Sequence, residues 1–87
     1  MCRNIRTLYN YAPLATAQEV HDAALQYVRK VAGTAKPSAA NMAVFEQAVD
    51  AVTAATQGLL DAMVTSAPPR DRAADAAKAR ERSARRW

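Results

Sequence analysis

The chain has 87 residues, enough for one domain and close to the lower limit for a chain that buries a core without disulfides or metals. Apolar residues make up 51% of it, but many are alanine, so we expect a thin core in the monomer. The net charge is +4, and one cysteine (Cys2) with one histidine (His21) excludes an internal disulfide and a zinc site, so we expect no metal and no cofactor.

The first helix is predicted from about residue 17 to residue 32. Thr16 and Glu19 have the spacing of a capping box, and Gly33 suits the position just after a helix end. The segment before Thr16 has no clear periodicity, and we expect its apolar side chains to pack on the helices. The larger apolar residues of the first helix fall on one stripe, which consists of Val20, Ala24, Tyr27, Val28 and Val31.

The second helix is predicted over residues 39–64, with Ser38 as its N-cap. Gly58 lies inside it and indicates either a close helix crossing or a mild bend. Apolar residues recur along it in steps of three and four, the spacing that keeps one seam facing a partner helix. The seam residues are Met42, Phe45, Val49, Val52, Leu59 and Met63, interrupted by Thr56.

The seam of the second helix is too long for the first helix alone to cover. At 1.5 Å per residue the second helix spans roughly 39 Å, whereas the first spans roughly 24 Å. The remainder is covered either by the N-terminal segment and the third helix or by a second copy of the chain, which would form a four-helix or larger bundle. We expect dimerisation, because isolated cores of this size are marginally stable.

The third helix is predicted over residues 70–86, and it contains no Val, Ile, Leu, Met or Phe. Residues 1–69 carry five basic and five acidic side chains, so the whole positive excess lies in residues 70–87. We expect this basic C-terminal helix to fray toward its end, where Trp87 is the one large side chain that could dock it.

These elements together predict an all-α fold. We expect a single domain over residues 1–87 that contains three helices and a short N-terminal segment packed on them, completed in one alternative by dimerisation. We expect a cytoplasmic protein that does not contact membranes, because neither a signal peptide nor an apolar run of about 18 residues can be recognised.

The chain resembles the DUF2277 family of proteins of unknown function. The resemblance is carried by the opening Met1-Cys2-Arg3-Asn4-Ile5 and by the junction Thr65-Ser66-Ala67-Pro68-Pro69-Arg70, together with residues 23–30 and the Lys36-Pro37-Ser38 turn. It implies that the chain is a complete protein, and it carries over no catalytic residue. The function therefore has to be predicted from the residues themselves.

The leading hypothesis is a small, non-enzymatic interaction or assembly protein that uses the seam of the second helix. Its partner would be a second copy of the chain or another helical protein.

An alternative is a nucleic-acid or ribosome-associated module that contacts phosphates through residues 70–87. Arginine and lysine side chains would neutralise phosphates, and a terminal tryptophan could stack on a base. The candidate residues are Lys78, Arg80, Arg82, Arg85, Arg86 and Trp87.

Catalysis has less support than either of these two hypotheses. Cys2 would become the first residue after removal of Met1, and a terminal thiol beside its own amine can act as a nucleophile. Arg3 and Arg6 would favour its thiolate. The sequence contains no accompanying catalytic set and only two glycines, Gly33 and Gly58, so a small buried cysteine is the simpler interpretation.

Overall fold

The first helix, α1 (Ala17–Ala32), begins and ends where the sequence predicts. In this computed structural model, which describes residues 3–85, the Oγ1 of Thr16 accepts a hydrogen bond from the Glu19 N–H at 3.1 Å. The Glu19 carboxylate accepts one in return from the Thr16 N–H at 2.9 Å, which completes the capping box. At the other end Gly33 adopts the left-handed conformation (φ 75°), and its N–H donates to the Arg29 carbonyl at 3.0 Å.

The second helix, α2 (Met42–Ala62), follows a short 3₁₀ turn, η1 (Ala39–Asn41). Ser38 precedes this turn, but its hydroxyl does not cap the helix. The helix ends two residues before the predicted boundary, because Met63 is already extended (ψ 143°). Just beyond, the Thr65 hydroxyl accepts a hydrogen bond from the Ala67 N–H at 3.1 Å, a local turn that competes with continued helix.

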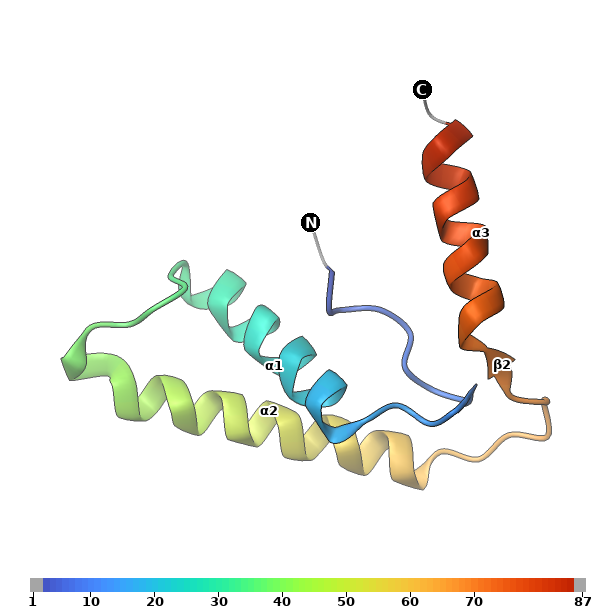
Figure 1. Cartoon of the computed structure of the whole chain (residues 1–87). Helices are drawn as coiled ribbons and strands as arrows, with labels where there is room; N and C mark the ends of the chain where they lie inside the picture. The colour runs from blue at the N-terminus through green and yellow to red at the C-terminus, as the bar shows by residue number, and fades with distance from the viewer. Residues whose placement is uncertain (1–2, 86–87) are drawn as a thin grey trace.

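α1 and α2 form an antiparallel hairpin with a narrow core (Figure 1). Val20, Ala24 and Val28 repeat every four residues and form the buried side of α1, which packs on α2, where Val49 is the buried residue. Leu8, from the N-terminal segment (residues 3–10), completes the buried apolar set of the described residues. The hairpin therefore buries a single line of side chains, and the predicted thin core is confirmed.

The third helix, α3 (Arg72–Arg85), begins two residues later than predicted. Its predicted first turn is instead the strand β2 (Arg70–Asp71), which pairs in parallel with β1 (Tyr11–Ala12). The Arg70 N–H donates to the Asn10 carbonyl at 2.7 Å, and the Asp71 carboxylate accepts from the Ala74 N–H at 2.9 Å as an N-cap would. Pairing across some sixty residues of sequence therefore overrides the local helix preference.

The chain forms a flat, single layer of helices. Figure 1 shows α3 projecting away from the hairpin, and the principal extents are 44 × 39 × 15 Å. The radius of gyration is 15.6 Å, compared with about 12 Å for a compact chain of this length. The all-α class with three helices is confirmed. Of the two elements expected to cover the rest of the seam, the N-terminal segment lies beside it and α3 does not.

The two glycines differ in what alanine would cost. A Cβ at Gly58 would meet no atom within 4 Å, so no other helix of the chain crosses α2 closely at this position. The close helix crossing predicted at Gly58 is therefore wrong within the single chain. Gly58→Ala should raise the free energy of unfolding by about 0.5–1 kcal/mol through helix propensity. Gly33→Ala should lower it by roughly 1 kcal/mol, because φ is positive at that position. Urea unfolding followed by circular dichroism measures both, and a destabilising Gly58→Ala would contradict the open environment.

Candidate functional site

An apolar groove follows one face of the α1–α2 hairpin. It consists of two adjoining hollows of about 590 and 370 Å³, and Tyr27 and Val52 line both. The first hollow lies between the end of α1 and the start of α2, and the second lies between the N-terminal segment and the end of α2. The residues that define the groove are Ile5, Tyr27, Val31, Val44, Phe45, Val52, Leu59 and Met63.

The groove gathers nearly all the exposed large apolar side chains of the described residues. Val31 is 71% exposed, Val44 61% and Leu59 57%, whereas such side chains are usually buried in a folded domain. Outside the groove, Leu14 and Val64 are the other large apolar side chains exposed in this part of the chain. A contiguous apolar patch of this kind is typical of an interaction surface.

The groove also contains almost no charge. Its first hollow is lined by no charged residue, and its second is lined by one, Arg6. The opposite face of the hairpin differs, because its hollow is lined by His21, Lys36, Glu46 and Asp50. Depletion of charge at the centre of a surface is the compositional mark of a protein interface, so the groove face is the stronger candidate site.

The six predicted seam residues line both faces of the hairpin, and Phe45 contributes to the hollow on each face. Phe45, Val52, Leu59 and Met63 line the groove. Val49 is buried between the helices, and together with the half-buried Met42 it lines the hollow on the opposite face.

Sequence reasoning missed four groove residues, Ile5, Tyr27, Val31 and Val44. Tyr27 and Val31 belong to the predicted apolar stripe of α1, but they are 50% and 71% exposed. The stripe is wider than the contact with one neighbouring helix, and this excess width is the signal that could have revealed them.

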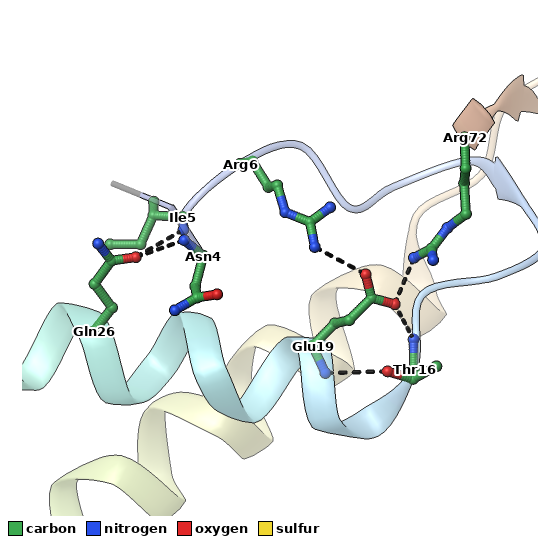
Figure 2. Close-up of polar contacts among 7 residues, drawn as sticks. All are labelled: Asn4, Ile5, Arg6, Thr16, Glu19, Gln26 and Arg72. Carbon is green, nitrogen blue, oxygen red and sulfur yellow. Dashed lines mark hydrogen bonds and ion pairs between the residues drawn. The ribbon is translucent and has the colours of Figure 1, made fainter. Parts of the chain in front are cut away.

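Glu19 joins three separate segments at one end of the hairpin (Figure 2). Its carboxylate accepts hydrogen bonds from the Thr16 N–H, from the Nη2 of Arg6 at 3.0 Å, and from the Nη2 of Arg72 at the start of α3. The Glu19 side chain is 17% exposed, so these charge-assisted contacts are partly shielded from water. One carboxylate therefore links the N-terminal segment, α1 and α3.

Two further contacts hold the N-terminal segment and the strand pair. The side-chain carbonyl of Gln26 accepts hydrogen bonds from the Asn4 N–H at 2.7 Å and the Ile5 N–H at 3.1 Å, which fixes the segment along α1 (Figure 2). The Tyr11 hydroxyl donates to the Asp75 carboxylate at 2.6 Å and so connects β1 to α3. The orientation of α3 thus depends on polar contacts and not on apolar packing.

The pKa of Glu19 is lowered from its ordinary value of 4.5 to about 2. The largest cause is the hydrogen bond from the Thr16 backbone, followed by the hydrogen bonds from Arg72 and Arg6; desolvation opposes them. Because the pKa of Glu19 is lower in the folded state than in the unfolded state, the ionised Glu19 carboxylate stabilises the folded state fully above pH 4.5. This contribution to the free energy of unfolding is lost as the pH falls from 4.5 toward 2.

Glu19→Gln should therefore lower the free energy of unfolding at pH 7 by roughly 2 kcal/mol and remove this part of the acid dependence. Urea titrations at several pH values between 7 and about 2 measure it. Glu46→Gln, at an exposed carboxylate on α2, is the matched control and should keep the wild-type profile. If Glu19→Gln loses as much stability on acidification as the wild type does, the ascribed role of Glu19 is wrong.

The remaining predicted site residues are only partly described. Lys78, Arg80 and Arg82 lie exposed on α3, whereas the Arg85 side chain, Arg86, Trp87 and Cys2 lie outside what the structure describes. No group of three metal-binding side chains occurs within residues 3–85. In the same range no helix is long and apolar enough to cross a membrane.

Comparison with known proteins gives one match. The family model described as "Uncharacterized conserved protein (DUF2277)" matches residues 1–78. No curated protein and no solved structure matches the chain significantly.

Proposed function

Because the chain belongs to the DUF2277 family of uncharacterized conserved proteins, we propose a function from its own surface: it self-associates through the apolar groove into a helical assembly of two copies. The observation that carries the proposal is the uncharged apolar groove on one face of the hairpin. A stable helical domain has at least two packed layers, whereas this chain supplies one layer about 15 Å thick. A second copy would provide the missing layer.

The accessible surface of the chain supports this proposal. It measures 6648 Å², compared with about 5,000 Å² for a compact chain of 9.4 kDa. The excess is larger than the roughly 800 Å² that each partner buries in a standard interface. The projecting α3 contributes part of the excess, but it carries no large aliphatic side chain. The apolar surface available for burial lies on the hairpin and the N-terminal segment.

The distribution of charge favours a second copy as the partner. Residues 1–69 are balanced in charge, and the positive excess lies in residues 70–87, on the part of the chain that contains α3. Two copies that meet groove to groove therefore bring uncharged centres together, and α3 projects away from the hairpin (Figure 1). Twofold pairing would stack two hairpins as a four-helix arrangement, in which each Val44 lies in the interface.

Val44→Arg should dissociate the assembly. An arginine at this position would place an unpaired charge in the apolar centre and weaken self-association roughly 100-fold, or about 3 kcal/mol. The matched control is Val64→Arg, the same substitution at a residue that is 93% exposed and lies outside the groove. Sedimentation equilibrium should give a dimer for the wild type and for Val64→Arg, and a monomer for Val44→Arg.

Circular dichroism separates loss of association from loss of folding, because Val44 is 61% exposed in the single chain. Val44→Arg should therefore retain a helical spectrum at concentrations where it is monomeric. A wild type that remains monomeric at about 100 μM would overturn the proposal, because an interface of standard size binds more tightly than this. Equal weakening by both substitutions would also overturn it.

A further inference from the structure

A second concave surface lies between the N-terminal segment, the start of α1 and the first turns of α3. This cleft has a volume of about 640 Å³, and its lining includes Glu19 together with Arg6 and Arg72. Its charged lining consists of the cations Arg6, Arg72, Lys78 and Arg82 and the carboxylates Glu19 and Asp75. The cleft shares Arg6 with the second hollow of the apolar groove, but the cations on α3 line only the cleft, so substitutions at Lys78 and Arg82 leave the groove lining intact.

Both carboxylates of the cleft already have partners within the chain. Glu19 accepts from Arg6 and Arg72, and Asp75 accepts from the Tyr11 hydroxyl at 2.6 Å. Lys78 and Arg82 differ, because neither makes a hydrogen bond or ion pair within the described part of the chain. The cleft therefore carries two positive charges that form no ion pair with an acidic side chain of residues 3–85.

The cations that α3 contributes to the cleft follow one another along the helix axis. Lys78 and Arg82 are four residues apart and lie about 6 Å apart along the helix axis, and Arg72 is about 9 Å before Lys78. Ala76 and Ala79 separate them in the lining, so a ligand can approach the α3 backbone closely. An elongated arrangement of this kind suits a chain of phosphates, which lysine binds as a point charge and arginine binds through its planar fork.

We propose that this cleft binds the phosphate backbone of a nucleic-acid strand, with Lys78 and Arg82 as its principal contacts and Arg6 and Arg72 at one end. The site differs from a uniformly basic C-terminal helix. It includes Arg6 and Arg72, which are not among the nucleic-acid contacts predicted from the sequence, and it omits Arg80, which lies on α3 outside the cleft lining. Contacts to phosphates alone predict binding that depends on salt and not on base sequence.

The test uses the full chain and a fluorescein-labelled oligouridine of about twelve nucleotides, titrated by anisotropy at several salt concentrations. With three or four phosphates neutralised, log K should fall against log salt with a slope of about −2 to −3. Lys78→Gln with Arg82→Gln should reduce the magnitude of this slope by about 1.4 and weaken binding at least roughly tenfold at low salt. The Lys78→Gln and Arg82→Gln substitutions should not alter the sedimentation of the protein without RNA.

Lys36→Gln with Arg80→Gln is the charge-matched control, because it also removes two positive charges and leaves the cleft lining intact. This control should retain the wild-type slope and most of the affinity. Equal losses in the two double variants would overturn the proposal, because binding would then follow net charge and not the cleft. Absence of binding by the wild type at low salt would also overturn it.

Discussion

Two antiparallel helices form only one layer, and one layer cannot bury apolar side chains on both of its faces. This constraint accounts for most features of the chain. The line of contact between α1 and α2 buries Val20, Ala24, Val28 and Val49 and leaves Val31 and Val44 in water. The N-terminal segment covers part of one face of the hairpin with Leu8. The rest of the same face stays open as the apolar groove. The groove is thus a consequence of topology and not of an unusual composition.

Polar contacts determine the position of α3 relative to the α1–α2 hairpin. α3 has no apolar stripe that could pack on the hairpin, so its position depends on Glu19, on the Tyr11–Asp75 hydrogen bond and on the short β1–β2 pair. Such contacts are individually weak when exposed, but here Glu19 is shared by three donors in a partly shielded position. The same contacts place Arg6 and Arg72 beside Lys78 and Arg82, so one junction both holds α3 and builds the cationic cleft.

Local signals predicted much of the fold. The capping box at Thr16 and the glycine at position 33 fixed both ends of α1, because each signal acts within a few residues. The start of α3 could not be predicted in this way, since Arg70 pairs with a segment some sixty residues earlier. Periodicity identified the seam of α2, but it could not indicate that Leu59 and Met63 would remain exposed, because exposure depends on how many neighbours the topology supplies. The two arginines at Glu19 come from distant segments and leave no local signal.

We propose above that a second copy of the chain covers the apolar groove. An isotope-filtered NOE experiment on a mixture of ¹³C-labelled and unlabelled protein can show this cover, because it detects contacts only between different copies. We predict intermolecular NOEs from the methyl groups of Val31, Val44 and Leu59, including contacts to the Tyr27 ring. Intermolecular NOEs confined to Leu25 and Met42 on the opposite face, or their absence in a sample that sediments as a dimer, would contradict the account.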